Sequence, residues 1–231
     1  MAERGLAKSR SLAQDLIKRG EVTVNGKPAA KPSQEVAESD DIRVANPLRF
    51  VSRAGEKLEG ALSAWDIDVA GLSVVDIGSS TGGFTDCLLQ RGAKSVVAID
   101  VGTGQLDAKL LDDPRVEVHE TTDVRKFSLP APVDMAVIDV SFISLSLVLP
   151  KAYEFVRSGG FGIALVKPQF EVGREIASKS KGVIRDQAER ERVLKETMAA
   201  AEKLGFKAVK HMDSPIEGEN GNREFLLLLQ K

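Results

Sequence analysis

The chain has 231 residues, of which 42% are hydrophobic and 29% charged, a composition that suits one or two globular domains and excludes disordered and fibrous proteins. Its single cysteine, Cys87, excludes an intramolecular disulfide framework, and its two histidines leave no metal-ligand spacing, so we expect no metal ion and a reducing, cytoplasmic location. The N-terminal stretch lacks the apolar core of a secretion signal, and aliphatic runs such as Leu226–Leu229 fall far short of the roughly 20 residues that cross a bilayer, so we expect no membrane contact.

The net charge of −2 hides an excess of basic residues near the N-terminal end. Residues 1–31 contain seven lysines and arginines against three acids, a net charge of +4, which leaves −6 for the rest of the chain. Such an excess is typical of a surface that contacts a polyanion. A solvated helix face explains so small an excess equally well, and both interpretations stay open at this point.

Residues 1–46 predict a helix followed by short strands. Ser9 is placed to cap the helix and Gly20 to end it, and the apolar residues between them share one face: Leu12, Leu16 and Ile17. Asn25-Gly26 predicts a hairpin turn, and residues 41–45, "DIRVA", predict a further short strand. The segment is therefore a small α+β unit.

This unit resembles the alpha-L RNA-binding domain, the type named after a small-subunit ribosomal protein. The residues that match its "SR..A..LI..G.V.VNG" pattern are Ser9, Arg10, Ala13, Leu16, Ile17, Gly20, Val22, Val24, Asn25 and Gly26. That family normally has an additional half-helix upstream, so we expect a shortened domain or a natural start upstream of Met1. The resemblance implies RNA binding by basic side chains of this unit: Lys8, Arg10, Lys18, Arg19 and Lys27.

Asn46 and Pro47 predict a linker, which divides the chain into domains 1–46 and 47–231. Beyond it, short apolar segments predict five strands: 73–78, 95–100, 116–120, 135–141 and 161–167. Segments of helical pattern lie between them, such as 83–92 and 145–160. This alternation predicts an α/β, Rossmann-like domain with a doubly wound, mostly parallel sheet that binds ligands at the carboxyl ends of its strands. The turn "EGENGN" joins 207–213 to 224–231, which predicts an antiparallel last strand at the sheet edge.

Residues 74–84, "VVDIGSSTGGF", predict a strand, a glycine turn and a helix start. Gly78 permits the tight turn, while Gly82 and Gly83 allow a ligand close to the backbone. The next strand ends at Asp100, where a carboxylate can accept both hydroxyls of a ribose, and Asp123 after the third strand can meet an adenine amino group. Each acid alone is also explained as a polar strand end, but their joint position favours a bound nucleoside.

The same loop resembles the nucleoside-binding loop of the class I S-adenosylmethionine methyltransferases. Ser79 and Ser80 stand where a dinucleotide-binding loop has its second glycine, which favours this resemblance over an NAD site. It implies S-adenosylmethionine as the cofactor, bound by Asp76, Gly78, Ser79, Ser80, Thr81, Gly82, Gly83, Phe84, Asp100, Val101, Asp123 and Asp139.

Two lysines and two carboxylates form a further candidate set. Lys57 lies in the predicted helix "SRAGEKLEGAL", Asp139 and Lys167 end the fourth and fifth strands, and Glu224 begins the last. The ends of strands four and five lie beside the ligand crevice of a doubly wound sheet, and an antiparallel last strand returns Glu224 to the same rim. Taken singly, Lys57 is explained as an exposed helix lysine and Glu224 as a charge that protects an edge strand.

In order and setting, these four residues match the lysine-aspartate-lysine-glutamate tetrad of the FtsJ-like ribose 2′-O-methyltransferases. Together with "DVSFISL", "LVKPQFE", "GNREFLLLL" and the N-terminal unit, they make nearly the whole chain resemble the TlyA family. The resemblance implies 2′-O-methylation of cytidines in ribosomal RNA, ribosomal subunits as partners, and Lys57, Asp139, Lys167 and Glu224 as catalytic residues. The alternatives are an RNA-binding protein with a catalytically weak methyltransferase domain, and the cytolysin that the family's other label, hemolysin, suggests.

The role of Lys167 has two readings, a general base or a fixed positive charge. An unperturbed lysine, with a pKa of ~10.4, is neutral in only about one molecule in two thousand at pH 7. Burial would lower that pKa, whereas Asp139 and Glu224 would raise it. Our hypothesis is that Lys167 stays cationic and stabilises the developing alkoxide, and that Lys57 supplements its field or binds the target phosphate.

Residues 171–186 lack strong periodicity and predict a loop over the mouth of the site, although an ordinary surface loop explains them equally well. Further RNA contacts are expected there and beside the first helix of the second domain, from Arg53, Arg174, Lys179 and Lys181. Because aromatic residues are only 5% of the chain, we expect shape and phosphate contacts to dominate RNA recognition. Nothing in the sequence indicates an oligomeric state.

Overall fold

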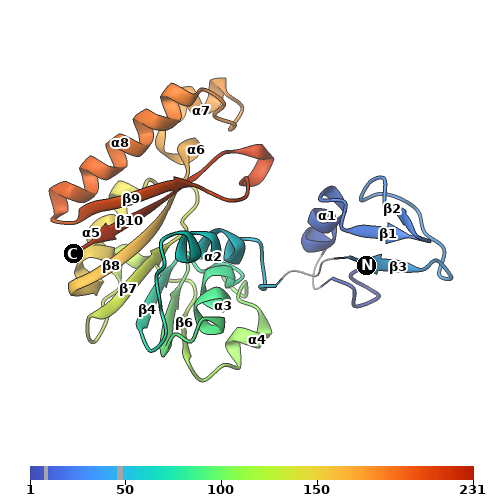
Figure 1. The fold of residues 1–231 in the computed structure, drawn as a ribbon, viewed down its shortest axis with the longest axis horizontal. Coiled ribbons are helices and arrows are strands. Elements are labelled where there is room, and N and C mark those ends of the chain that lie inside the picture. Colours follow the sequence, from blue (N-terminus) through green and yellow to red (C-terminus); the bar gives the residue numbers. More distant parts are fainter. Residues whose placement is uncertain (8–9, 46–48) are drawn as a thin grey trace. The chain divides into compact units, whose positions relative to one another are not determined.

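The computed structural model of the chain describes residues 1–7, 10–45 and 49–231 (Figure 1). These residues form two compact units, Met1–Ser52 and Arg53–Lys231. The predicted cap Ser9, the basic residue Lys8 and the predicted linker at Asn46 and Pro47 lie outside the described residues. Each unit is described by itself.

The first unit packs one helix against a small antiparallel sheet. Helix α1 spans Arg10–Lys18, and the sheet has the order β2 (Lys27–Pro28), β1 (Val22–Val24), β3 (Ile42–Val44). Its core contains Ala13 and Leu16 of the helix with Val22 and Ile42 of the sheet, while the side chain of Leu12 is outside the described part. The predicted helix and hairpin are confirmed. Asn25 and Gly26 have φ of 52° and 75°, the left-handed values that a type I′ hairpin turn requires.

The second unit is built on a seven-stranded sheet in the order β6-β5-β4-β7-β8-β10-β9. The strands are β4 (Ser73–Ile77), β5 (Ser95–Ile99), β6 (Val116–His119), β7 (Val133–Ile138), β8 (Val156–Val166), β9 (Lys207–Asp213) and β10 (Phe225–Gln230). Strands β4 to β8 pair in parallel, and β10 pairs antiparallel with both β8 and β9. The predicted mostly parallel sheet with an antiparallel last strand is confirmed.

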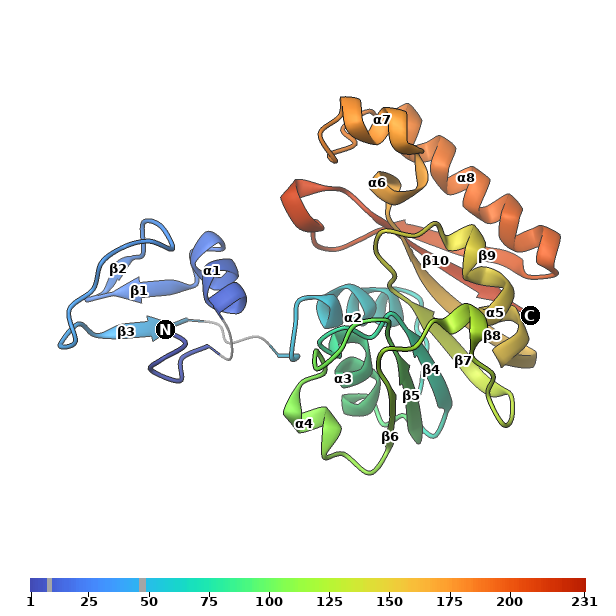
Figure 2. The same ribbon diagram turned by 180° about the vertical axis from the view of Figure 1, so that it is seen from behind.

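Helices cover both faces of this sheet (Figures 1 and 2). One face carries α2 (Ala54–Ala64), α3 (Gly83–Gln90) and the short α4 (Ala108–Leu111), and the other carries α5 (Leu149–Phe155) and α8 (Gln187–Leu204). Leu149 and Phe155 of α5 and Val193 of α8 are buried in one core cluster with strand residues. The remaining helical turns are α6 (Pro168–Glu171), α7 (Arg174–Lys179), η1 (Val124–Lys126), η2 (Leu145–Leu147) and η3 (Glu219–Gly221). The doubly wound architecture thus leaves the carboxyl ends of the parallel strands open to the connecting loops.

The predicted helix at 145–160 is wrong at its C-terminal end. Helix α5 ends at Phe155, and β8 begins at Val156 and includes Gly159 and Gly160. The two glycines exchange backbone hydrogen bonds with Lys231, because Gly159 N–H donates to Lys231 O and Lys231 N–H donates to Gly160 O, both at 2.9 Å. A Cβ at Gly160 would lie 2.6 Å from the carbonyl oxygen of Asp134, so only glycine fits this close approach. The segment is therefore a strand because it forms hydrogen bonds with Lys231, which is distant in the sequence.

Two further predictions need correction. The last strand, β10, is internal, and β9 forms the sheet edge, because the chain passes from α8 to the outside before it returns between β8 and β9. Residues 171–186 are not one loop, since they contain α7 and end at Asp186, whose carboxylate accepts the Ala188 and Glu189 N–H groups and caps α8. Among the described residues, no helix is both long and apolar enough to span a membrane.

Candidate active site

Two ion pairs lie where β7 and β8 end and β10 begins, one of them buried and the other partly buried. Lys57 Nζ is 2.6 Å from Glu224 Oε2, and Lys167 Nζ is 2.6 Å from Asp139 Oδ1. The side chains of Lys57 and Glu224 are 10% and 2% exposed, so this pair is almost withdrawn from water. The structure therefore brings the four predicted catalytic residues into two pairs, each with one positive and one negative charge.

The sheet and helix α2 account for this meeting. Phe225 of β10 pairs with Val166 of β8, so Glu224 and Lys167 occupy the next position of the same strand pair. Asp139 directly follows β7 and its N–H donates to Ile77 O of β4, which places it beside the glycine turn. Helix α2 packs against α3 and β10, and a Cβ at Gly60 would lie 2.7 Å from Pro215 in the β9–β10 connection. This position of α2 carries Lys57 to Glu224.

Lys167 stands at the junction between β8 and α6. Its Nζ donates a 2.8 Å hydrogen bond to Ser141 Oγ in addition to the ion pair with Asp139, and it lies 5.8 Å from the centre of the Phe170 ring. An ammonium is a donor only, so a carboxylate and a hydroxyl oxygen are suitable acceptors for it. Pro168 does more than stop the strand, because it is the first residue of α6 and follows Lys167 directly.

Glu224 is fixed from several sides. Its Oε1 accepts a 3.2 Å hydrogen bond from Gln169 Nε2, and Gly218 lies so close that a Cβ there would collide with the carboxylate. The buried Arg190 of α8 donates to Arg223 O at 3.3 Å and lies 4.9 Å from the centre of the Phe225 ring. The carboxylate that receives Lys57 is thus held in place by the residues on both sides of it in the chain.

The glycine turn after β4 has the backbone shape that close ligand approach requires. Gly78 and Gly82 have φ of 85° and 91°, and Ser80 between them has φ of 47°. A Cβ at Gly78 would lie 2.5 Å from the carbonyl oxygen of Asp139, so a side chain is excluded at this point. Asp100, after β5, closes the turn because its Oδ2 accepts the Ser80 N–H at 2.8 Å and its Oδ1 accepts the Gly102 N–H at 2.7 Å.

Asp76 is a buried acid beneath this turn. Its Oδ2 accepts the Thr85 hydroxyl at 2.6 Å, while its buried Oδ1 has no hydrogen-bond partner among the described residues. Burial raises the pKa of Asp76 to about 7, and the nearby charges of Asp139 and Asp100 contribute to the increase. A buried carboxyl oxygen without a partner is a suitable acceptor for a cationic group of a ligand.

The loop after β5 is shaped by an acid from the next strand. Glu120 accepts the backbone N–H groups of Gly104, Gln105 and Leu106 at 2.6, 2.8 and 3.1 Å, and these bonds lower its pKa. Val101, at the start of the loop, is 73% exposed. An aliphatic side chain held in water beside Asp100 is suited to cover the flat face of a nucleobase.

Asp123 has a local partner that the sequence analysis did not include. Its carboxylate binds the guanidinium of Arg125, with Asp123 Oδ2 2.7 Å from Arg125 Nη2. It also accepts the backbone N–H of Arg125 at 3.0 Å. These contacts with Arg125 lower the pKa of Asp123 to about 2. Its predicted contact with an adenine amino group stays a prediction.

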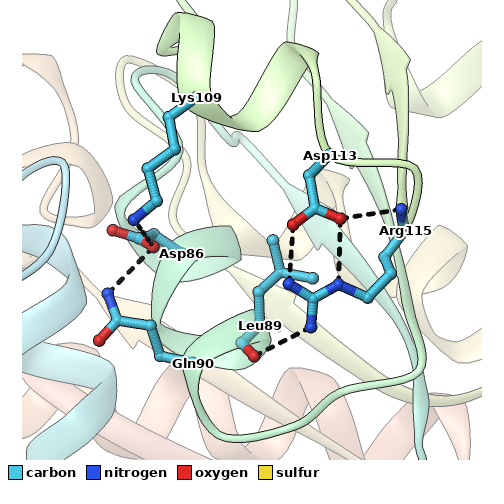
Figure 3. Close-up of polar contacts among 6 residues, drawn as sticks. All are labelled: Asp86, Leu89, Gln90, Lys109, Asp113 and Arg115. Atoms are coloured by element: carbon cyan, nitrogen blue, oxygen red, sulfur yellow. Dashed lines mark hydrogen bonds and ion pairs between the residues drawn. The ribbon is translucent and has the colours of Figure 1, made fainter.

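Two polar clusters bind α4 and residues 113–115, which follow the loop after β5, to α3 (Figure 3). Asp86 of α3 is buried and accepts Lys109 Nζ at 2.8 Å and Gln90 Nε2 at 3.0 Å. The guanidinium of Arg115 donates from Nη2 to Asp113 Oδ2 at 2.7 Å and from Nη1 to Leu89 O at 3.2 Å. Because α3 begins at the glycine turn, these contacts tie α4 to the same helix that supports the turn.

An exposed aromatic side chain lies beside Lys167. Phe142 is 89% exposed, has a φ of 64°, and its ring centre is 5.0 Å from that of Phe170. A left-handed backbone is uncommon for a bulky residue and is typical of functional sites. The signal in the sequence was "DVSFISL", where an aromatic residue directly follows the predicted strand 135–141, but this residue was not among the predicted site residues.

The predicted RNA-binding residues lie on the surface where the structure describes them. Arg10, Lys18, Arg19 and Lys27 are exposed on the first unit. On the second unit, Lys179 is paired with Glu175 at 2.7 Å, Lys181 is exposed with a φ of 50°, and Arg53 is partly buried. The side chain of Arg174 lies outside the described part. No cluster of three or more metal-ligating side chains occurs within the described part of the chain.

Comparison with known families shows to which family the chain belongs. Residues 50–231 match the FtsJ-like methyltransferase family, and residues 1–42 match the S4 domain. The chain belongs to the FtsJ-like methyltransferase family. A family member from Mycobacterium tuberculosis, named 16S/23S rRNA (cytidine-2′-O)-methyltransferase TlyA, is 43% identical to it, over 100% of this chain and 87% of that protein. Hemolysin A of Brachyspira hyodysenteriae is 42% identical, over 96% of this chain and 94% of that protein.

Two solved structures are similar to this chain. A protein from Streptococcus thermophilus, named as a hemolysin, matches with a TM-score of 0.81 and 41% identity over 99% of this chain and 85% of that one. A methyltransferase from Listeria monocytogenes, described as dependent on S-adenosylmethionine, matches with a TM-score of 0.57 and 17% identity over 77% of this chain and 97% of that one. The second likeness shows the fold alone, which is that of an S-adenosylmethionine-dependent methyltransferase.

Proposed function

We propose that this FtsJ-like methyltransferase transfers the methyl group of S-adenosylmethionine to the 2′-hydroxyl of cytidines in ribosomal RNA. The observation that carries the proposal is the pair of ion pairs, Lys57–Glu224 and Lys167–Asp139, at the strand ends beside the glycine turn. Relatives named for this activity cover 94% to 100% of the chain, and the family match covers the whole second unit.

The residues around the glycine turn fit S-adenosylmethionine. Gly78 and Gly82, whose left-handed φ favours glycine, leave the backbone of the turn without side chains, and Asp76 offers a buried oxygen for the ammonium of the methionine part. Asp100 is placed for the ribose hydroxyls and Val101 for the adenine face. When bound, the cofactor supplies an electrophilic methyl group on a sulfonium.

Lys167 then acts on the hydroxyl that receives the methyl group. In our proposal its ammonium, held by Asp139 and Ser141, directs its remaining N–H toward the 2′ oxygen and stabilises the negative charge that develops there. A bond forms between the 2′ oxygen and the methyl carbon, the bond from that carbon to sulfur breaks, and the hydroxyl proton passes to solvent. Lys57 adds positive charge to the same field or binds the target phosphate. Alignment of the two reacting atoms contributes about 7 kcal/mol or more in well-oriented reactions, so holding Lys167 and the substrate still is a large part of the task.

The substrate side combines an exposed ring with basic side chains. Phe142, beside Lys167, is available to contact a base, and Lys181 lies in the connection between α7 and α8. The exposed Arg10, Lys18 and Lys27 of the S4 unit would contact phosphates, so binding of ribosomal subunits weakens as salt increases. A protein that methylates ribosomal RNA is expected in the cytoplasm.

The direct test incubates purified protein and ribosomal subunits with S-adenosylmethionine that carries a labelled methyl group. We expect label on the ribose of cytidine, located by nuclease digestion and mass spectrometry, and no label with Lys167→Ala. Absence of transfer by the wild-type protein, or label on a base instead of a ribose, would refute the proposal. Leakage of liposomes without any methyl donor would support the cytolysin alternative instead.

A further inference from the structure

We infer that Glu171 is a positioning residue for methyl transfer: it fastens the loop 139–145 to the segment 167–171 and so fixes the direction of Lys167. The inference rests on the proposed function, because it assigns Glu171 to the same reaction. Glu171 belongs to neither of the two ion pairs, and its side chain is directed at the backbone of the loop instead of the reacting atoms.

The loop 139–145 and the segment 167–171, which together we call the clasp, contact each other in the same order along both segments. Lys167 Nζ binds Asp139 Oδ1 at 2.6 Å and Ser141 Oγ at 2.8 Å. The rings of Phe170 and Phe142 follow, with their centres 5.0 Å apart. These contacts join the catalytic end of the clasp.

Glu171 closes the far end of the clasp. Its Oε2 accepts the Ser144 hydroxyl at 2.6 Å, and its Oε1 accepts the Leu145 N–H at 2.8 Å. Leu145 is buried in the core and begins η2, so the carboxylate binds the loop at the point where it re-enters the protein. Glu171 is partly buried, and this burial raises its pKa, while its two acceptor contacts act in the opposite sense.

Both halves of the clasp need such an anchor. Helix α6 is a single turn of four residues, which is too short to be stable without tertiary contacts. The loop contains exposed Ser141 and exposed Phe142, and the left-handed φ of Phe142 is strained for a bulky side chain. A strained, exposed loop keeps one conformation only where its surroundings determine it, and Glu171 supplies two such contacts.

Lys167 depends on this anchor because both of its acceptors, Asp139 and Ser141, belong to the anchored loop. If the loop shifts, Ser141 moves with it and the ammonium loses one of the two acceptors that fix its direction, whereas Asp139 stays beside the glycine turn because its N–H donates to Ile77 O. A misplacement of 1 Å in a catalytic arrangement can lower the rate about 100-fold. The glycine turn and Asp100 make no contact with Glu171 among those described, so cofactor affinity should be preserved.

The experiment compares four variants of the full chain: Glu171→Ala, Glu171→Gln, Ser144→Ala and the double variant Glu171→Ala/Ser144→Ala. Asp134→Ala is the control, because Asp134 also accepts one backbone N–H and one serine hydroxyl, both from Ser73, but at the amino ends of β4 and β7, where it also binds Arg157 at 2.8 Å. The measurements are kcat and KM with ribosomal subunits, the Kd for S-adenosylmethionine by calorimetry, and thermal unfolding.

We expect Glu171→Ala to lower kcat about 10- to 100-fold, as for a misplaced catalytic group, and to leave the Kd for S-adenosylmethionine within about threefold. Glu171→Gln should recover part of kcat, because its amide oxygen still accepts the Leu145 N–H. Ser144→Ala should lower kcat less, and it should add nothing in the Glu171→Ala background because both changes open the same contact. The Asp134→Ala control should lower the unfolding temperature with kcat unchanged.

A folded Glu171→Ala variant with kcat within about threefold of wild type overturns the inference, as does an equal loss of kcat in the Asp134→Ala control. Additive effects of Glu171→Ala and Ser144→Ala overturn it as well. If Glu171→Ala does not fold, wild-type kcat in both Glu171→Gln and Ser144→Ala is the overturning result. A wild-type protein that transfers no methyl group refutes the proposed function, and the inference falls with it, whereas an active wild type with unaffected variants refutes the inference alone.

Discussion

Replacing the buried carboxyl of Asp76 by an amide should change stability in a way that depends on pH. The Asp76 pKa is raised from 3.8 to about 7 in the folded protein. Because the folded-state pKa is the higher one, the protonated form favours the fold fully below pH 3.8, and this contribution is lost as the pH rises to 7. Above that pH, the ionised carboxylate destabilises the fold by a constant amount.

The size of this effect follows from the shift. With about 1.4 kcal/mol for each pH unit, the penalty is about 2 kcal/mol at pH 5 and about 4 kcal/mol at pH 8. In Asp76→Asn the amide oxygen can still accept the Thr85 hydroxyl, and the unpartnered amide N–H₂ costs about 1–3 kcal/mol at every pH. The free energy of unfolding of the variant, relative to wild type, should therefore rise by about 2–3 kcal/mol between pH 5 and pH 8.

Urea unfolding, followed by the fluorescence of the single tryptophan, Trp65, measures this difference in the second unit, because Trp65 lies directly after α2. Calorimetry at pH 8 should show that Asp76→Asn binds S-adenosylmethionine more weakly, since a neutral amide replaces the carboxylate that faces the ammonium. A stability difference that is the same at both pH values would refute the assigned protonation behaviour. Equal cofactor affinity in both proteins would refute the assigned contact.

Three further predictions concern the site. Lys57→Ala should destabilise the second unit by about 3–5 kcal/mol because it leaves the Glu224 carboxylate buried and unpaired. Lys57→Met combined with Glu224→Leu should restore much of the stability without restoring activity. The midpoints of denaturant unfolding of both variants test this prediction. Lys167→Arg should abolish most turnover even though it keeps the charge, because a planar guanidinium spreads its donors over three nitrogens and cannot reproduce the single Nζ that binds both Asp139 and Ser141. A near-wild-type rate in a single-turnover assay would contradict the need for a lysine. Glu120→Ala should weaken S-adenosylmethionine binding several-fold with kcat at saturation unchanged, because it releases the loop that carries Val101, and an unchanged Kd would disprove that role.

The strand pattern was enough to predict where the two strand-end members of the tetrad lie. Asp139 and Lys167 follow buried apolar strands, and parallel strands end at one rim, so their meeting needed no further information. Glu224 required one more step, the antiparallel return of the last strand, which its glycine-rich turn indicated. The pairing of Lys57 with Glu224 could not be predicted from the sequence, because it depends on how α2 packs against α3 and β10.

Other parts were missed because their partners are distant or purely local. The strand at 156–160 forms through bonds to Lys231, more than 70 positions further along the chain, and no local pattern reports such a partner. Glu171 binds Ser144 and Leu145, which lie more than 25 positions earlier in the chain. The pattern around it, "KPQFE", supports the family resemblance but does not indicate this contact. Arg125, two residues from Asp123, was not foreseen as its partner, and the predicted contact of Asp123 with an adenine amino group stays a prediction.

The place of β10 between two neighbours limits how the chain can change in length. Because it pairs with β8 on one side and β9 on the other, a single-residue insertion within Phe225–Gln230 would turn alternate side chains to the wrong face along both ladders. Glu224 would then point away from Lys57, and the leucines of β10 would point toward water. Length variation among functional descendants of this sequence should therefore gather in surface connections such as that between β5 and α4, whereas β10 keeps its length even where its individual leucines are exchanged for other apolar residues.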